Sequence, residues 1–468
     1  MPTIRYRLLV IPCCVALYAC LVSTAAAATL CVNPHNTACY SSIQAAVNHA
    51  SAGDTVNVAP GTYDEFVTIG IPISLVGWDN RSTIIDAGGL PHGIFIDGVD
   101  NPGLSNVNIT GLTVENALYE GILIVSASNV TISNDQVNDN DTSPGLVFTG
   151  ATTGCPGQPG TGVYENDETG DCGGAIHLIG VSHSIVSDNY ITGNADGVLI
   201  SDETAESHDN MLLHNQIVNN PLECGIVLAS HPPNGYSAAP YGPHFGVDHN
   251  TVAENVSMGN GVEVGGSGVG IFSDGNGAGT VVGNVILRNT LVGNGLGGVA
   301  IHTHVGPAFG LPADNFSGNV IIGNYIAKNL ADTADTATPG TVGININSGG
   351  GGSPIQGTVV SDNTIEDEQF DIAVNTPSEV DIHLNNLDGG KVGVGDVCAY
   401  DSATICTGSI DASENYWGCA KGPGAAGCST VSGTDIEFAP WLGMPVSEDD
   451  TSGRIGPFNP IVSRESFK

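Results

Sequence analysis

The stretch of sequence that decides the fold is DNYITGNADGVLI, from Asp188 to Ile200. It joins an Asn motif, x-N-x-[VIL]-x-x-[N or acid], to a short aliphatic run that opens with Gly197. Short aliphatic runs bounded by Asn and Gly are typical of β-strands separated by tight turns. The stretch therefore predicts two short strands, each followed by a turn.

Both motifs recur along the chain, at irregular intervals that indicate loops of varying length. The Asn motif returns in a poorer copy starting at Asn134 and then as His214-Asn215-Gln216-Ile217, His249-Asn250-Thr251-Val252, Arg288-Asn289-Thr290-Leu291, Gly323-Asn324-Tyr325-Ile326 and Asp362-Asn363-Thr364-Ile365. The Gly motif opens at Gly93, Gly121, Gly174, Gly197, Gly225, Gly268, Gly298 and Gly343. Repetition on this scale predicts a solenoid of stacked units.

A parallel β-helix accounts for these repeats. One short coil cannot bury its apolar face, but stacked coils can, at the ordinary strand spacing of about 4.8 Å. Asn at a fixed turn position can adopt a left-handed backbone, and its side-chain amide can bond to the next copy in a ladder. The prediction is an all-β chain, a single right-handed parallel β-helix with a short N-terminal capping helix.

The ends of the chain fit this architecture. Residues 42–49 predict a short amphipathic helix that would protect the open edge of the first coil. The expected organisation is a signal peptide at 1–28, an N-terminal cap and first coil at 29–70, and β-helix coils at 71–397. C-terminal coils and a cap follow at 398–446, and a loose tail at 447–468.

Charge and leader limit the functions that the chain can have. The formal net charge is −38, from 48 acids and 10 bases, which argues against nucleic-acid or anionic-membrane partners. Arg5 and Arg7 followed by an apolar run from Leu8 to Val22 are typical of a secretory signal. The expected location is therefore secreted, periplasmic or at the cell surface. A lipoprotein box ending at Cys20 fits less well.

The cysteines agree with export. Of the 12 cysteines, Cys13, Cys14 and Cys20 would leave with the signal. An oxidising compartment favours disulfides, although sequence does not determine connectivity. Proximity suggests the pairs Cys31 with Cys39, Cys155 with Cys172, Cys398 with Cys406 and Cys419 with Cys428, which leaves Cys224 over. Zinc is disfavoured because no CxxC pair or spaced His pair accompanies them.

Three features resemble a known superfamily: the helix followed by GDTV…PGTY, the N-x-I-x-x-N coils, and the NYWG…PW ending. They resemble secreted right-handed β-helix proteins of the pectate-lyase-like superfamily, and within it the group around the periplasmic copper-accessory protein NosD. The resemblance extends over nearly all of the mature chain. It implies the fold but leaves the activity open, since the superfamily includes lyases, hydrolases, epimerases and non-catalytic surface proteins.

Candidate site residues emerge when the coils are aligned on the opening Gly. The first and third residues after Gly are mostly aliphatic and should point inward, so residues at even offsets should point outward. The sixth position holds Glu203, His231, Asp274 and His304, with Asp202 beside the first and His302 on the same outer face as the last. Neighbouring acids and imidazoles could perform acid–base catalysis or hold a divalent ion. The alternative is that these residues form a solvated polar edge of the coil without a function. His177 falls at an inward offset, which favours a core histidine.

Two inserts would rise beside this row, Thr149 to Gly170 and His231 to Phe245. The second carries Tyr236, Tyr241 and His244, which could bind a sugar or simply pack the loop. The insert after His231 could also be an additional coil. Between Arg81 and Lys391 the only basic side chains are Arg288 and Lys328, and both lie away from the row. An anionic substrate would therefore need a bridging Ca2+, and no other cofactor is expected.

These observations favour an exported carbohydrate-active enzyme, a lyase or glycoside hydrolase, without deciding that the chain is an enzyme. The expected partner is an extracellular polysaccharide, and we expect a monomer with no membrane span. The catalytic candidates are Asp202, Glu203, His231, Asp274, His302 and His304, and the substrate-binding candidates are Tyr236, Tyr241 and His244. A non-catalytic envelope or surface glycan-binding protein and a NosD-like metal accessory protein are the alternatives.

Overall fold

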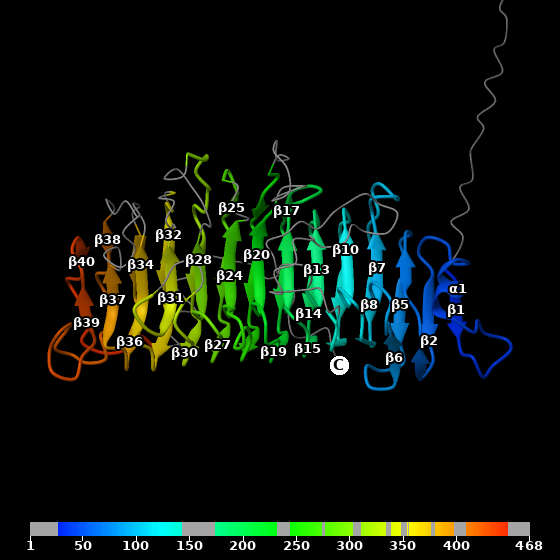
Figure 1. Cartoon of the computed structure of the whole chain (residues 1–468), viewed down its shortest axis with the longest axis horizontal. Helices are drawn as coiled ribbons and strands as arrows, with labels where there is room; N and C mark the ends of the chain where they lie inside the picture. The colour runs from blue at the N-terminus through cyan, green and yellow to red at the C-terminus, as the bar shows by residue number, and fades with distance from the viewer. Residues whose placement is uncertain are drawn as a thin grey trace, which may run out of the picture.

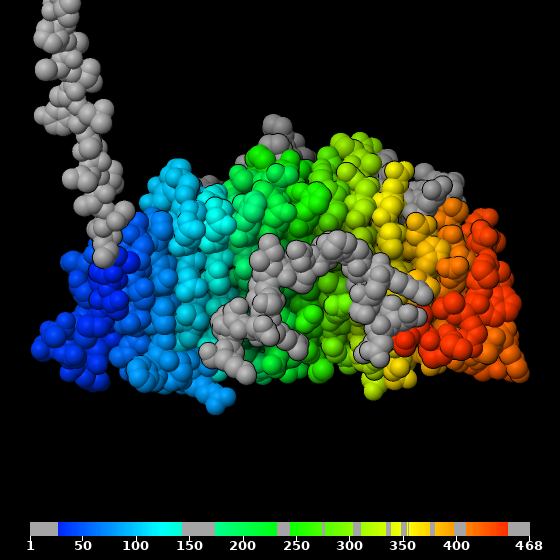
Figure 2. Space-filling model, turned by 180° about the vertical axis from the view of Figure 1, so that it is seen from behind, coloured from blue at the N-terminus to red at the C-terminus, as the bar shows by residue number. Residues whose placement is uncertain are grey.

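The chain folds into an elongated right-handed parallel β-helix (Figure 1), as the repeats predict. The computed structural model describes residues 27–142, 174–231, 244–273, 277–302, 310–333, 338–347, 353, 355–375, 380–396 and 409–447. Within these residues the coils stack as successive bands along the rod (Figure 2). Three long parallel sheets run the length of the rod, and we name them sheets A, B and C in the order in which the chain enters them.

Sheet A contains 14 strands in the described residues. Its strands are β1 (Thr29–Val32), β2 (Thr55–Val58), β5 (Ser74–Gly77), β8 (Asn108–Thr110), β11 (Thr131–Ser133), β14 (Ile185–Ser187), β18 (Met211–Leu213), β22 (Thr251–Ala253), β26 (Val285–Leu287), β29 (Val320–Ile322), β32 (Thr358–Ser361), β35 (Val380–His383), β38 (Ile410–Asp411) and β40 (Ile436–Glu437).

Sheet B follows sheet A within each coil and contains 11 strands in the same part of the chain. Its strands are β3 (Gly61–Tyr63), β6 (Thr83–Asp86), β9 (Thr113–Glu115), β12 (Gln136–Asn138), β15 (Tyr190–Thr192), β19 (Gln216–Val218), β23 (Val256–Met258), β27 (Thr290–Val292), β30 (Tyr325–Ala327), β33 (Thr364–Glu366) and β36 (Asn386–Asp388).

Sheet C completes the coil and contains 12 described strands. Its strands are β4 (Val67–Ile69), β7 (Ile94–Asp97), β10 (Ile122–Val125), β13 (Ile176–Ile179), β16 (Val198–Ser201), β20 (Ile226–Ser230), β24 (Val269–Ser273), β28 (Val299–His302), β31 (Val342–Asn347), β34 (Phe370–Asn375), β37 (Val392–Asp396) and β39 (Thr430–Ser432). Between sheets C and A, the central coils add the short strands β17 (Ser207–His208), β21 (Val247–Asp248) and β25 (Val281–Val282).

The core lies inside the three sheets and follows the predicted offsets. Val198 and Ile200, the first and third residues after Gly197, are fully buried in the main hydrophobic cluster. The equivalent residues of the next coil, Ile226 and Leu228, lie directly beside them in the sheet. Each coil contributes only a few aliphatic side chains, so the stack as a whole buries them.

Asn ladders hold the corners of the coil, as predicted. Asn255 Oδ1 accepts bonds from both the backbone N–H and the side-chain amide of Asn215, each at 2.9 Å. Asn255 Nδ2 donates in turn to Asn289 Oδ1 at 3.0 Å and to the carbonyl of Leu212. This ladder runs between sheets A and B from Asn189 to Asn415, and a second one runs from Asn140 to Asn329 between sheets B and C.

Two details of the predicted ladder were wrong. The left-handed residue is the one before the ladder Asn, as at Asp188 and His214, and the ladder Asn itself lies directly before the next strand. Asn250 belongs to a third ladder, with Asn210 and Asn284, at the entry to sheet A. The motif therefore recurs at three corners, which contributes to its irregular spacing.

The N-terminal cap is the helix α1 (Ile43–Val47), within the predicted range. Ser42 caps it by accepting a bond from the backbone N–H of Ala45. Ile43, Ala46 and Val47 are buried against the first coil, so the helix closes the core at that end.

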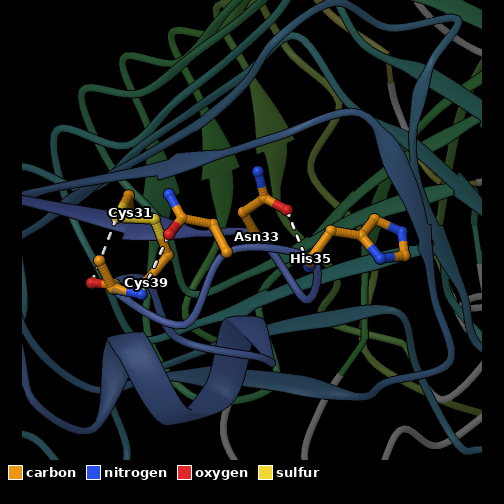
Figure 3. The surroundings of a disulfide bond; sticks show 6 residues. Cys31, Asn33, His35 and Cys39 are labelled. Atoms are coloured by element: carbon orange, nitrogen blue, oxygen red, sulfur yellow. Dashed lines mark hydrogen bonds between the residues drawn. A yellow bond between two sulfur atoms is a disulfide. The ribbon is translucent and has the colours of Figure 1, made fainter.

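Two of the predicted disulfides lie in the described residues and are confirmed. Cys31 pairs with Cys39 beside α1 (Figure 3), in a turn where Asn33 Oδ1 accepts a bond from the His35 backbone N–H. Cys419 pairs with Cys428 near the other end of the rod. The pairs Cys155–Cys172 and Cys398–Cys406, the predicted signal peptide up to residue 26, and the tail after Ser447 lie outside the described residues.

Cys224, which the predicted pairing leaves over, is buried, and its Sγ accepts a bond from the Ser267 N–H. No helix in the described part of the chain is long and apolar enough to cross a membrane.

Candidate functional site

The outer face of sheet C differs from the outer faces of the other two sheets. Along sheets A and B, buried residues alternate with partly exposed ones, as in β14 and β19. In β10, β13, β16 and β20 of sheet C every residue is buried, including those that point away from the core. Outward aliphatic and aromatic residues form separate clusters on sheet C, around Leu123, around Val227 and around Phe370. Polar side chains buried on this face make it the candidate site.

The strand register corrects the prediction for His177. Ile176 pairs with Val198 and His177 pairs with Leu199, so Ala175 occupies the position that Gly197 holds in the next coil. Counting from Gly174 therefore misplaced the copy by one residue. Because alternate side chains point to opposite faces, this slip moves His177 from the core to the outer face.

Two predicted residues, Glu203 and His231, meet on this face. They follow the neighbouring strands β16 and β20, and Glu203 Oε1 lies 3.5 Å from His231 Nδ1. Glu203 Oε2 accepts a 2.5 Å bond from Ser201 Oγ, and Ser201 Oγ also lies 2.8 Å from His177 Nε2. Ser201 therefore links the carboxylate to a second imidazole on the opposite side.

The polar contacts continue toward the N-terminal coils. His177 Nδ1 lies 3.7 Å from Glu120 Oε1, and Glu120 Oε2 lies 2.5 Å from His92 Nδ1. We call His92, Glu120, His177, Ser201, Glu203 and His231 the acid–imidazole chain. It crosses five adjacent strands of sheet C, from β7 to β20, and each member is at most 3% exposed.

The charged groups of the acid–imidazole chain favour the ionised form of Glu203. Burial raises the pKa of the Glu203 carboxyl, but the hydrogen bond and charge of His231, the charge of His177 and the Ser201 hydroxyl outweigh burial and leave that pKa below its ordinary value. Opposite charges and donors favour the carboxylate form in this way. Glu203 is thus a carboxylate held between two imidazoles, available as a base or as a cation ligand.

Asp202, the neighbour of Glu203, performs a different task. Its carboxylate accepts bonds from the backbone N–H groups of His231, Phe245 and Gly246 at 2.6, 2.8 and 2.6 Å. Ser230 Oγ adds a fourth bond at 3.1 Å. Burial raises the pKa of Asp202 to about 7, with a further contribution from the charge of Glu203. These contacts make Asp202 a positioning residue that holds the end of β20 next to the backbone of Phe245 and Gly246.

His244 and His302 contact residues outside the acid–imidazole chain. His244 Nδ1 is 2.8 Å from Ser230 Oγ, so the ring lies at the end of β20 that Asp202 also contacts. His302 ends β28, three strands beyond β16, and lies on the outer face as predicted. Its ring centroid is 4.2 Å from that of Phe272, and its Nδ1 is 4.0 Å from Asp332 Oδ2.

The remaining predicted site residues fall outside the described residues. These are Asp274, His304, Tyr236 and Tyr241, and the insert Thr149 to Gly170 falls outside with them. Strand β20 pairs directly with β24, so the insert after His231 adds no extra coil to sheet C. Arg288 and Lys328 precede ladder residues at the corners that flank sheet B, away from the outer face of sheet C as predicted.

Sequence inspection missed His92, Glu120, His177 and Ser201 as site residues. Ser201 is at the fourth, outward position of its copy, so the repeat could have identified it. His92 and Glu120 each stand just before an opening Gly, outside the aliphatic run that defines the repeat. Of the acid–imidazole chain, Glu120 and Glu203 are the carboxylates that could bind the expected Ca2+, which stays a prediction.

Comparison with known proteins agrees with the fold. Residues 81–237 match the family model described as a right handed beta helix region. The catalytic domain of a GH87 alpha-1,3-glucanase in complex with nigerose is 14% identical, with a TM-score of 0.51, over 90% of this chain and 68% of that chain. At this identity the similarity concerns the fold alone. No curated protein sequence is significantly similar to this chain.

Two further solved structures are similar over most of their own length. The A-module of a mannuronan C-5 epimerase from Azotobacter vinelandii is 17% identical, with a TM-score of 0.46, over 86% of this chain and 95% of that chain. An alginate lyase from a Paenibacillus strain is 11% identical, with a TM-score of 0.40, over 88% of this chain and 99% of that chain.

Proposed function

We propose that the protein is an exported enzyme that cleaves a polysaccharide on the outer face of sheet C, with Glu203 and His231 as the reacting pair. The observation that carries this proposal is the 3.5 Å contact between an ionised carboxylate and an imidazole on a buried face that also holds apolar clusters. Glycosidic bond cleavage uses a titratable acid and a base that flank the scissile bond, and Glu203 and His231 supply one of each. The polysaccharide-acting proteins that share the fold are consistent with this proposal.

Hydrolysis can be written with these two residues if the substrate enters between them and separates them, because the acid and the base must flank the scissile bond. Glu203 then takes a proton from an attacking water on one side, and a protonated His231 gives a proton to the leaving sugar oxygen on the other. The hydroxide then forms the new bond to the anomeric carbon as the glycosidic bond breaks, so one water is added. A proton passing from Glu203 to His231 across their contact restores both groups. Ser201 and His177 orient Glu203 from the other side.

The charge distribution favours a neutral glycan. Between Arg81 and Lys391 the sequence has only two bases, Arg288 and Lys328, and both lie at corners away from the site. The net negative charge of the protein would repel a uronate polymer unless a cation such as Ca2+ bridged the polymer to the site. We therefore propose glycoside hydrolase activity in preference to lyase activity.

The test is a screen of the purified protein against neutral and uronate polysaccharides, with Ca2+ or with EDTA. New reducing ends without unsaturated-product absorbance are expected for a neutral glycan, and this activity should not need Ca2+.

Glu203→Gln should lower kcat by about a hundredfold or more, since the base is lost while the shape is kept. Glu254→Gln removes a partly exposed carboxylate that pairs with His214 on the surface, and it should leave kcat unchanged. Full activity of Glu203→Gln on a cleaved glycan would refute the assignment.

One observation favours a second candidate, a non-catalytic surface protein. Every member of the acid–imidazole chain is at most 3% exposed, and a polar chain so fully buried can serve to hold adjacent coils together. In that case no glycan of the panel is cleaved, while Glu203→Gln still lowers the melting temperature.

A further inference from the structure

A second group of imidazoles and carboxylates lies outside the candidate site. His183 precedes β14, and His208 and Asp209 follow one coil later at the same corner between sheets C and A. One ligand atom from each of the three side chains lies within 4.8 Å of the other two. We propose that His183, His208 and Asp209 bind a divalent first-row transition ion, with Zn2+ as the representative probe.

The distances suit such an ion. His208 Nδ1 lies 2.9 Å from Asp209 Oδ2, and His183 Nε2 lies 3.7 Å from the same oxygen. Ligand atoms around a tetrahedral ion with bonds of about 2.1 Å are about 3.4 Å apart. The two observed separations lie on either side of that value, so small side-chain rotations would suffice to complete the coordination.

The backbone holds the three residues in place before any ion arrives. The His183 N–H donates to the His208 carbonyl at 3.1 Å, and the flanking Ser182 forms a parallel bridge with His208. His183 and Asp209 both adopt left-handed backbone conformations, with φ of 53° and 55°. Since these conformations repeat at the same corner of successive coils, the ion would join two adjacent coils of a preformed frame.

The donor set selects the class of ion. Two imidazoles and one carboxylate suit Zn2+, Ni2+ or Cu2+, whereas Ca2+ and Mg2+ prefer oxygen ligands. The three side chains are between 29% and 56% exposed, so an ion can reach them from solvent and keep one position for water. In this exposure the three residues differ from the acid–imidazole chain on sheet C, whose members are buried.

The surroundings are strongly acidic. In the next coil, Asp248 pairs with His249 at 2.6 Å, and its hydrogen bond to Glu206 raises the pKa of the Glu206 carboxyl. Such crowding of carboxylates around the two imidazoles attracts cations, as does the net charge of −38.

The experiment measures Zn2+ binding by calorimetry on the EDTA-treated, dialysed full-length protein. His183→Asn and His208→Gln should each weaken Zn2+ binding by about tenfold or more, because each substitution removes one of three ligands. Asn is chosen at position 183 because it tolerates the left-handed backbone conformation there. His214→Gln is the matched control. His214 lies on the same kind of surface but contacts Glu254 and Asp188 through different ring nitrogens, and its loss should leave the affinity within twofold.

A spectrum identifies the ligands independently of affinity. Co2+ in the native protein should give visible absorption bands typical of low coordination number, and the His183→Asn/His208→Gln double variant should lose them. The described residues hold one other group of three, Asp381, His383 and Asp411, which has a single imidazole; binding that survives in the double variant would arise there. Unchanged Zn2+ affinity and Co2+ bands in a folded double variant, or selective binding of Ca2+ over Zn2+ by the native protein, would overturn the proposal.

Discussion

Glu203 Oε1 lies 3.5 Å from His231 Nδ1, and the two residues reach each other from the ends of adjacent strands in successive coils. This contact exists because β16 and β20 are in register, with Ser201 beside Ala229. The register therefore turns two residues that are distant in sequence into one acid–base pair.

The Glu203 contact predicts an acid-dependent loss of stability. A pKa below its ordinary value means that the carboxylate stabilises the folded state above about pH 4.3, and that this contribution disappears as the pH falls through the folded-state pKa. Glu203→Gln should therefore be less stable than the native protein at pH 7, by roughly 1 to 3 kcal/mol, and the difference should shrink toward pH 3. Urea unfolding at both pH values measures it. A difference that is equal at pH 7 and pH 3 would show that the charge of Glu203 contributes nothing.

Asp135 predicts the opposite pH dependence. It occupies the position before Asn189 in the ladder between sheets A and B, where later coils have Asn, and burial raises its pKa to about 8. Since the folded state holds this proton, stability should fall as pH rises from about 4 to about 8. Asp135→Asn should remove that fall and be more stable at pH 8 by roughly 1 to 3 kcal/mol.

The control for Asp135 lies in the same coil. Asp139 is exposed, so Asp139→Asn should leave the pH dependence of unfolding unchanged. An Asp135→Asn variant that is no more stable than the native protein at pH 8 would mean that Asp135 is already ionised at little cost.

The Asn ladders should be costly to interrupt. Asn255→Ala leaves the Asn215 N–H and side-chain amide and the Leu212 carbonyl without their partner inside the protein. Each unmet buried group costs about 1 kcal/mol or more, so the variant should lose roughly 3 kcal/mol of unfolding free energy. Gln216→Ala, an exposed change in the preceding coil, should cost less than about 0.5 kcal/mol in the same denaturant titration.

The disulfides can be mapped directly. Peptide mass spectrometry without reduction should find Cys31 linked to Cys39 and Cys419 linked to Cys428. Cys224 should react with a thiol reagent only after unfolding, because it is buried in the native protein. Recovery of a peptide that joins Cys31 to Cys428 would contradict the fold, since these residues lie near opposite ends of the rod.

His177 shows where sequence reasoning reached its limit. Gly174 looks like the opening Gly of a coil, and only the hydrogen-bonded pairing of Ile176 with Val198 reveals that Ala175 holds that position. A shift of one residue exchanges core and surface, and local sequence does not contain the information that decides between them. Glu203 and His231 were found because their copies carry an unambiguous Gly at the expected place.

The sequence by itself determined the solenoid, the inward positions such as Val198 and Ile200, the Asn ladders and the capping helix. These features depend on local preferences that every coil repeats, so they can be predicted from the sequence pattern alone. Only the tertiary structure decided that His92, Glu120 and His177 join Glu203, that Asp202 accepts bonds from the backbone of the next coil, and that His183 meets His208. Such contacts depend on the register between coils, which long-range hydrogen bonding and the packing of the whole stack establish together.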